Sequence, residues 1–469
     1  MTGRRFRAQG SAAASLLLLA CAAGLVCASF AQASFELTTP RLLSDPSPVA
    51  FPPDYAARST GGGLAVWGQQ PDSGEASIHV ASISEGGRPG EAMEVDHDPE
   101  AYLLRPSIAT APDGQTALAW AAVDPVARQT TVRTAAIGPD GEPGAVHEVD
   151  TASDTAAMGA GESEVLVDSS GRLVLVWAAY RRLGFFSYRT ELRWARIGAD
   201  GGLLGDVNVV PLDPPSLLYG LQVAIDSADR VTAGWLHDPV GNPFGDMQIE
   251  TVRFGLDGER SPIRQLTSGP HEVSGFDLVV AADGRATVAW RSLLGKERVQ
   301  AVQLAASDAE PGPVLELSGP QTKASGPVAA IGPGGRITVL WERWHRLTVH
   351  SRLMKGLAVQ VVSQQIKPGG ALGPVRPLSE RRSRGSKPAI VSTAAGRLFA
   401  AWQREGGPDT RRKIQLARLD RAGRVARSAA AGPGGGPALA ISGGGRPVVS
   451  WRTADPEPAN RPIAVSTLR

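Results

Sequence analysis

The chain has 469 residues, 42% of them hydrophobic, and a formal net charge of +2 at neutral pH. That length is ample for a large folded core, and a nearly neutral chain does not favour nucleic acid as a partner. The charge is nevertheless polarised: residues 34–250 carry 13 Lys and Arg against 30 Asp and Glu, whereas residues 251–469 carry 32 against 16. A basic arc in the second half would suit an anionic polymer.

Residues 1–33 have the pattern of a signal peptide. Three arginines precede an apolar run over residues 12–26, and Ala31-Gln32-Ala33 supplies a small-x-small cleavage site. We therefore expect a mature chain that begins at Ser34 and lies outside the cytoplasm, secreted or periplasmic. We expect it to have no transmembrane helix, because the apolar run is short for a membrane span. The alternative is a lipoprotein anchored at Cys21, since Leu18-Leu19-Ala20-Cys21 resembles a lipoprotein cleavage box.

Cysteine is confined to this leader, where Cys21 and Cys27 are the only two. Cleavage before Ser34 would leave no disulfide, no thiolate nucleophile and no cysteine metal site. The sequence also contains no H-E-x-x-H, G-x-S-x-G or EF-hand pattern. We therefore expect neither a metal nor a cofactor.

A short pattern recurs eight times along residues 34–469. Its tryptophans stand at nearly even intervals and are Trp67, Trp120, Trp177, Trp235, Trp290, Trp341, Trp402 and Trp451. Six residues before each tryptophan stands glycine, with Asp229 as the one exception, and arginine follows that position in six of the eight copies. Such repetition indicates one supersecondary unit present eight times.

The copy around Trp120 indicates four strands. Its apolar or β-prone runs cover residues 105–110, 116–120, 131–137 and 144–149. The turn sequences Pro112-Asp113-Gly114 and Pro139-Asp140-Gly141 separate the first two runs and the last two, and glycine accepts the positive φ of such turns. No stretch shows a sustained helical period, so each repeat is predicted to form four antiparallel strands.

The strand that ends in tryptophan is apolar on both faces. In residues 172–177 and 336–341, alternate side chains point to opposite faces of the strand, yet both sets are largely apolar. Each small sheet must therefore be covered on both sides, with tryptophan packed between neighbours. We predict an all-β fold, an eight-bladed β-propeller of four-stranded antiparallel blades that forms a single domain over residues 34–469.

The two ends of the chain predict how the ring closes. Only one strand, residues 463–468, follows Trp451, whereas residues 35–44 supply an extra strand before the first repeat. We expect the N-terminal strand to complete the last blade, which would leave no exposed sheet edge there, and we expect a monomer. Seven blades plus an irregular one are the alternative.

The pattern G-R-h-h-h-h-W, where h is hydrophobic, and hairpins such as residues 137–141 resemble the repeats of uncharacterised secreted bacterial β-propellers, loosely akin to sialidase-like propellers. The likeness covers residues 34–469. The sialidase Asp-box itself is absent, because its glycine stands three residues before tryptophan rather than six. The resemblance implies the fold, an exported location and carbohydrate or protein binding, but no reaction.

The segments just after the tryptophans form the predicted ligand face, because the loops after the second strands of a propeller share one side of the ring. Planar guanidinium groups gathered there would bind a carboxylate or sulfate. The resemblance to sialidase-like enzymes implies a tyrosine and an acidic partner, roles that fall to Tyr180 and to Glu342 or Glu405. The candidate residues are Tyr180, Arg181, Arg182, Arg291, Glu342, Arg343, His345, Arg404 and Glu405. The competing interpretation is that an arginine-rich chain carries arginines in surface loops.

Two further segments have unusual composition. Residues 183–188 include three aromatic side chains, which suit a sugar ring or a peptide, and residues 376–427 are rich in arginine, which suits an anionic polymer. The competing interpretations are aromatic burial over a neighbouring blade and a solvated loop edge.

Two functions are compatible with these patterns. The favoured hypothesis is an exported binding or scaffold module at the cell envelope, with no catalytic role and with a carbohydrate, an anionic polymer or a protein as its partner. The alternative is a glycan-active enzyme with a sialidase-like arginine funnel. That alternative requires Arg181, Arg291, Arg343 and Arg404 to project into one pocket beside a carboxylate.

Overall fold

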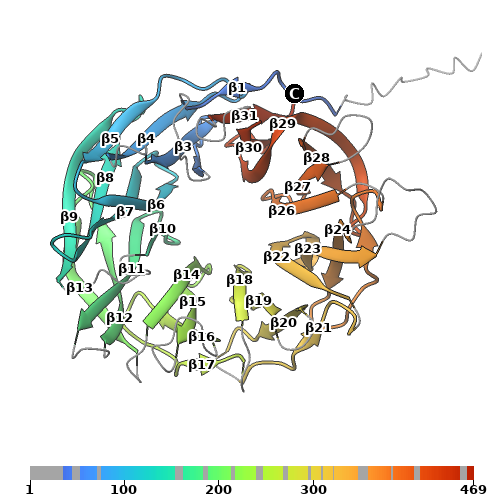
Figure 1. Ribbon diagram of the computed structural model, residues 1–469. Helices are drawn as coiled ribbons and strands as arrows, with labels where there is room; N and C mark the ends of the chain where they lie inside the picture. The colour runs from blue at the N-terminus through green and yellow to red at the C-terminus, as the bar shows by residue number, and fades with distance from the viewer. Residues whose placement is uncertain are drawn as a thin grey trace, which may run out of the picture. The chain divides into compact units, whose positions relative to one another are not determined.

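The computed structural model describes residues 35–44, 53–70, 75–153, 162–182, 188–212, 217–238, 247–267, 273–293, 297–307, 310–320, 322–346, 357–381, 384–405, 412–454 and 462–469. These residues belong to one compact unit, Phe35–Arg469, built almost entirely of β-strands (Figure 1). The predicted leader, its cleavage site and Cys21 lie outside the described residues. Within the described ranges, no helix is long and apolar enough to cross a membrane.

Six sheets contain four antiparallel strands each, in sequence order. The first two comprise β2 (Asp54–Ala57), β3 (Gly63–Gln69), β4 (Ala76–Ile83) and β5 (Met93–Asp98), then β6 (Tyr102–Thr110), β7 (Thr116–Asp124), β8 (Gln129–Ile137) and β9 (Pro143–Ser153). The next two comprise β10 (Ser163–Val167), β11 (Leu173–Arg182), β12 (Tyr188–Ile197) and β13 (Leu203–Pro211), then β14 (Leu217–Ile225), β15 (Arg230–Asp238), β16 (Gln248–Gly255) and β17 (Arg264–Gln265). The last two comprise β18 (Val273–Val280), β19 (Ala286–Ser292), β20 (Arg298–Leu304) and β21 (Leu315–Glu316), then β22 (Ala324–Ile331), β23 (Ile337–Arg346), β24 (Leu357–Ile366) and β25 (Arg376–Pro377).

The seventh sheet has seven strands, in the order β1-β31-β30-β29-β28-β27-β26. They are β26 (Arg384–Ser392), β27 (Leu398–Glu405), β28 (Lys413–Leu419), β29 (Val425–Ile441), β30 (Pro447–Thr453), β31 (Ile463–Thr467) and β1 (Arg41–Leu42). Residues 425–433 of β29 pair with β28, and residues 434–441 pair with β30. Strand β1 pairs with β31, with Leu42 opposite Ala464. The predicted all-β class with four-stranded antiparallel sheets is confirmed, while the described residues form seven sheets rather than eight.

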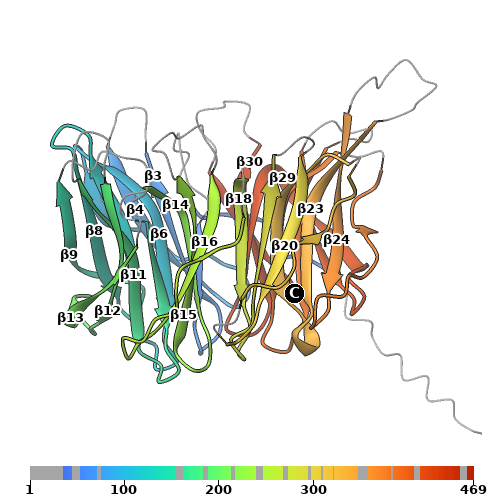
Figure 2. The same ribbon diagram turned by 90° about the horizontal axis from the view of Figure 1, so that it is seen from below.

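The first strands of successive repeats lie side by side in a circle. Contacts join β2 to β6, β6 to β10, β10 to β14, β14 to β18, β18 to β22, β22 to β26, β26 to β29, and β29 back to β2. Figure 1 shows β6, β10, β14, β18, β22 and β26 innermost, with the later strands of their sheets farther out, and Figure 2 shows the sheets standing side by side. The arrangement is consistent with a β-propeller.

The eight repeated tryptophans fill the space between neighbouring sheets. Each is at most 3% exposed, and Trp120 belongs to the same buried cluster as Leu64 and Val66 of the preceding sheet. Its indole Nε1 also donates a 2.8 Å hydrogen bond to the carboxylate of Asp96 on β5. The prediction that tryptophan packs between sheets is confirmed, and the indole N–H adds a polar link that the sequence pattern did not indicate.

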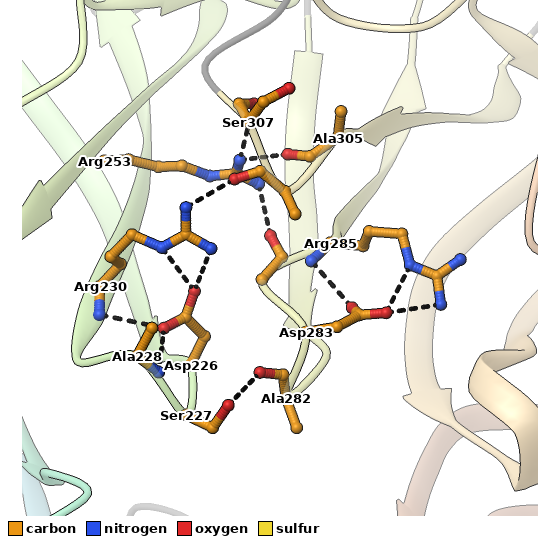
Figure 3. Close-up of polar contacts among 12 residues, drawn as sticks. Asp226, Ser227, Ala228, Arg230, Arg253, Ala282, Asp283, Arg285, Ala305 and Ser307 are labelled. Atoms are coloured by element: carbon orange, nitrogen blue, oxygen red, sulfur yellow. Dashed lines mark hydrogen bonds and ion pairs between the residues drawn. The ribbon is translucent and has the colours of Figure 1, made fainter.

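The position six residues before each tryptophan lies in the turn between the first and second strands. The seven glycines there have φ between 69° and 95°, a left-handed conformation that costs glycine little. Asp229 adopts the same conformation, with φ of 59°, and its carboxylate accepts hydrogen bonds from the Ser169 backbone N and Oγ at 2.6 and 2.8 Å. The following arginine can fold back on the turn: Arg230 Nε donates to Asp226 Oδ2 at 3.0 Å (Figure 3).

Candidate functional site

One position on the innermost strands has the same register in every repeat. It pairs with the residue just before the tryptophan of the second strand, and its separation from that tryptophan in the sequence is the same in every copy; we call it the wall position. The eight wall residues are Asp54, Ser107, Glu164, Gln222, Asp277, Val328, Ala389 and Ala438. The first five are polar and the last three are apolar, so the inner face of the ring has a polar sector and an apolar sector.

Most polar wall residues bind the backbone of the next inner strand. Asp54 Oδ2 accepts from the Ile108 N–H at 3.0 Å, and Asp277 Oδ2 accepts from the Ala329 N–H at 2.5 Å. Ser107 Oγ accepts from the Val165 N–H at 3.1 Å in the same way. Each bond joins two repeats that share no ladder hydrogen bond, so these side chains hold the inner circle of strands together.

Glu164 departs from this pattern because its carboxylate faces the preceding strand. Its Oε2 accepts a hydrogen bond from Ser107 Oγ at 3.0 Å. Burial raises the pKa of the Glu164 carboxyl to about 7, and the neighbouring Asp54 charge acts in the same direction. The carboxyl groups of Glu164 and Asp54 therefore flank residues 107–108 of β6 from the two sides.

Both residues of this pair lie at solvent-accessible positions of the innermost strands. Asp54 is exposed and Glu164 partly exposed, although protein surrounds them. This enclosure raises the pKa of Asp54, while hydrogen bonds from the Ile108 and Tyr55 backbone N–H groups oppose the shift. Two acids with different hydrogen-bond partners thus lie close together at a solvent-accessible wall.

A cation lies near this pair. Arg105 has φ of 36° within an irregularity of β6, and its side chain is 75% exposed. Its Nη1 lies 3.9 Å from Oε1 of Glu162, whose other oxygen, Oε2, accepts from the Leu221 N–H. Burial raises the pKa of Glu162, whereas the Leu221 hydrogen bond and the Arg105 charge lower it. An exposed guanidinium is therefore held next to Glu162, and its charge also lowers the pKa of Glu164.

A cavity of about 270 Å³ adjoins Asp54. Its wall includes Tyr55 of β2, Val391 of β26 and Ala438 and Leu439 of β29, so it belongs to the apolar sector apart from the β2 side. The hydroxyl of Tyr55 is buried without a hydrogen-bond partner among the described residues, and burial raises the pKa of that hydroxyl. The cavity offers a mostly apolar surface beside one carboxylate.

This arrangement suits acid–base chemistry. A carboxyl group with a pKa of about 7 is partly protonated at neutral pH, as a general acid requires. Two titratable groups held in different environments are a common way to divide the acid and base roles. Among the described residues, no group of three or more His, Cys, Asp or Glu side chains could hold a metal ion.

The arginines predicted from the sequence are not brought together by their described contacts. Arg291 pairs with Glu297, which also binds Lys323 at 2.6 Å. Arg404 pairs with Glu380 at 3.1 Å.

Arg343 donates to Gln360, and burial lowers the pKa of Arg343, with the nearby Arg381 charge acting in the same direction. Arg181 and Arg182 end β11, but their side chains lie outside the described residues, as do residues 183–187 of the aromatic segment.

The predicted acidic and aromatic candidates also have local partners. Tyr180 is 4% exposed in the core, and its hydroxyl donates to the Leu218 carbonyl. Glu342 accepts from the Ser325 hydroxyl at 3.2 Å and from the Lys387 backbone N at 2.8 Å.

His345 Nε2 lies 3.1 Å from the Arg381 carbonyl oxygen, and Glu405 pairs with Arg412 at 2.6 Å. The pocket that the arginine funnel requires is not formed by these contacts.

Asp54 and Glu164 are not among the predicted site residues, because the predicted ligand face follows each tryptophan whereas the wall position precedes it. The signal is the constant separation in sequence between the wall position and tryptophan, from Asp54 to Trp67 in the first copy. Read at that spacing, the sequence places three carboxyl groups at one register.

No protein-family model matches the chain, and no curated protein matches it in sequence. Similar solved structures exist. The β-propeller domain of the Trilobed protease from Pyrococcus furiosus has 9% identity over 81% of this chain and 97% of that chain, with a TM-score of 0.44. An α-L-arabinanase of Penicillium chrysogenum complexed with arabinobiose has 13% identity over 92% and 98%, with a TM-score of 0.39. The GH93 α-L-arabinofuranosidase of Fusarium graminearum has 12% identity over 66% and 93%, with a TM-score of 0.37.

These findings contradict the favoured sequence-based hypothesis of a scaffold module with no catalytic role, because two of these propellers are glycoside hydrolases. That hypothesis is abandoned. At such identities and TM-scores the likeness transfers no activity, so support for the alternative has to come from the residues of this chain. The resemblance to secreted and sialidase-like propellers stays a prediction.

Proposed function

We propose that this chain is a glycan-active enzyme that cleaves a glycosidic bond at the inner wall of the ring, with Glu164 and Asp54 as its acid pair. One observation carries the proposal: two carboxyl groups from nearby repeats flank Ser107, and one of them has a pKa of about 7. Most glycoside hydrolases need two such groups, one protonated and one ionised.

The environments assign the roles. Glu164, whose pKa is about 7, donates the proton to the leaving oxygen. We assign the ionised role to Asp54, because two backbone N–H groups donate to its carboxylate and oppose the rise in its pKa that burial causes. Arg105 is exposed beside them and orients polar groups of the substrate, while the apolar side of the 270 Å³ cavity accepts the carbon face of a sugar ring. The arginine funnel has no part in this proposal.

The finer architecture belongs to the same proposal. We infer that the seven-stranded sheet is two blades that share the long strand β29, which makes eight blades in all. The pairing of β1 with β31 supports an N-terminal strand that completes the last blade. Export by the predicted leader would expose such an enzyme to extracytoplasmic glycans.

The test is turnover of a panel of fluorogenic glycosides, with a glycan array to find the bound sugar. Glu164→Gln is expected to lower kcat by about 10²–10⁴-fold, since it removes the proton donor. Asp277→Asn is the matched control, because Asp277 is a wall carboxylate outside the pair, and it is expected to leave turnover near that of the unmodified chain.

The pH dependence of kcat/KM provides an independent check, because kcat/KM reports the pKa values of the free protein. Because Glu164 must be protonated, the rate is expected to fall as the pH rises through about 7, and this limb is expected to vanish in Glu164→Gln. No turnover of any glycoside, or equal rates in the unmodified chain and Glu164→Gln, would refute the proposal.

A further inference from the structure

A second cavity, of about 510 Å³, is rich in arginine, and neither Asp54 nor Glu164 lines it. It is lined by residues of the β14–β15 turn, the β16 strand and the hairpin that follows it, together with one residue of β12 in the neighbouring sheet. Its four arginines are Arg196, Arg230, Arg253 and Arg260. Such a concentration of guanidinium groups around one hollow is a candidate anion site.

Arg196 and Arg253 occupy the same register in successive repeats. Each pairs with the residue three positions before tryptophan on the second strand, Val174 for Arg196 and Thr232 for Arg253. The repeat therefore presents both guanidinium groups at equivalent places along the junction with the next sheet.

Arg253 shows which contacts an arginine at this position can make with the next sheet. Its side chain is buried, and it donates to carbonyl oxygens of the next sheet: Gly284 at 2.9 Å, Ser307 at 3.3 Å, and Ala305 (Figure 3). Several donors of this guanidinium are thus engaged across the junction.

Arg196 lacks the equivalent bonds. Its Nε is buried and has no hydrogen-bond partner among the described residues, and its ion pair with Asp168 is 3.7 Å long. The Asp168 carboxylate is already taken by Arg172, through the backbone N at 2.9 Å and Nε at 3.2 Å. Arg196 therefore lines the cavity with hydrogen-bonding capacity that the protein does not use.

The other charged groups of the lining are mostly engaged with the protein. Arg230 binds Asp226 at 2.9 Å and the Ala306 carbonyl at 2.7 Å. Asp229 is occupied by Ser169, as described above.

In the following hairpin, Asp257 Oδ1 accepts from the Glu259 backbone N at 3.2 Å, and the Glu259 side chain is exposed. Arg260 is exposed at the rim, with its Nη1 3.5 Å from the Pro211 carbonyl. Two arginines, Arg196 inside the cavity and Arg260 at its rim, could therefore bind an anion.

We propose that this cavity binds a small oxyanion group, sulfate or a carboxylate, with Arg196 as the principal ligand and Arg260 as the second. The planar fork of a guanidinium matches two oxygens of such a group, and Arg196 and Arg260 both line the cavity. The anion is either free in solution or carried on an acidic glycan. The site does not depend on the proposed hydrolysis, because it uses none of the same residues.

The experiment is calorimetric titration of the full chain with sodium sulfate, against sodium chloride at matched ionic strength. We expect saturable sulfate binding that Arg196→Ala weakens at least about tenfold. Arg196→Lys keeps the positive charge but not the planar guanidinium fork, so this variant is expected to bind sulfate less tightly than the unmodified chain. It provides the test if the alanine variant fails to fold. Arg418→Ala is the matched control, because Arg418 occupies the same register in β28, opposite Phe399, outside this cavity.

Titration with sulfated and unsulfated lactose separates the two sources of the anion. Tighter binding of sulfated lactose than of sulfate would assign a glycan-borne anion, whereas binding of sulfate alone would assign a free one, and both outcomes support the site. Sulfate binding that sodium chloride reproduces, or that Arg196→Lys and Arg418→Ala change equally, would overturn it.

Discussion

The inner wall of the ring differs between its first five repeats and its last three. In the polar sector most wall residues bind backbone groups of the adjacent strand, as Asp54 and Asp277 do. In the apolar sector the same register holds Val328, Ala389 and Ala438. Backbone pairing and spacing are the same in both, so the fold does not require either residue type. The repeat provides the same backbone structure in both sectors, and only the polar sector carries ionisable side chains at the wall position.

Tryptophan packing belongs to both sectors, so its removal should cost the same in each. Trp290→Ala, in the polar sector, and Trp341→Ala, in the apolar sector, are each expected to lower the free energy of unfolding by about 3–5 kcal/mol, because both side chains are 1% exposed. Urea denaturation followed by fluorescence measures the loss. A much smaller cost in one sector would show that its sheets are not held by the same packing.

Truncation at the wall position should separate the sectors. Asp277→Ala is expected to cost about 1–3 kcal/mol, because the Ala329 N–H loses its acceptor. Val328→Ala, the matched truncation in the apolar sector, removes two methyl groups and no hydrogen bond, so it should cost less. Equal values from urea denaturation would mean that the inter-strand bonds add no stability.

The polar sector should also make stability depend on pH. Burial raises the pKa of Asp277 from 3.8 to about 6 and that of Glu164 from 4.5 to about 7. The folded state therefore binds more protons than the unfolded state between about pH 4 and 7, and stability falls as the pH rises through that window, by about 1.4 kcal/mol for each unit of pKa difference.

The amide variants test this dependence. Asp277→Asn and Glu164→Gln are each expected to flatten the plot of unfolding free energy against pH, since neither amide titrates. Val328→Ala, which removes no ionisable group, should keep the full slope. An unchanged slope in both amide variants would contradict the pKa shifts.

The parts of the fold that were predicted correctly are those with a local and repeated signal. Apolar runs, glycine turns and tryptophan spacing recur in each copy, and even Asp229 keeps the left-handed turn of the glycines. The wall position escaped notice because residue type is not repeated there: Asp54, Ser107 and Glu164 share only a register, which becomes visible once the first strand is paired.

Side-chain partners were the least predictable feature. A cluster of arginines after the tryptophans indicated a shared pocket, but Arg291 and Arg343 each find a partner on the neighbouring strand or loop, Glu297 and Gln360. Such pairings depend on register and on rotamers, which composition does not specify. Arg196 and Arg253 give a second example. They have the same register in successive repeats, but their hydrogen-bond partners differ because their surroundings differ.

The smallest expected effect comes from grafting one sector onto the other. Ser107 Oγ accepts from the N–H one position beyond the wall residue of the next repeat, Val165. The equivalent N–H for Ala389 is that of Leu439, so Ala389→Ser would offer it a new acceptor. We expect a gain in stability of about 0.5–1.5 kcal/mol in urea denaturation.

The neighbouring repeat provides the control for this graft. The equivalent N–H for Ala438 is that of Tyr55, which already donates to Asp54 Oδ1 at 2.8 Å. Ala438→Ser therefore has no free donor to bind and should gain nothing. Stabilisation of both variants to the same extent would mean that the hydroxyl acts by some route other than the inter-strand bond, and the distinction between the sectors would then rest on the acid pair alone.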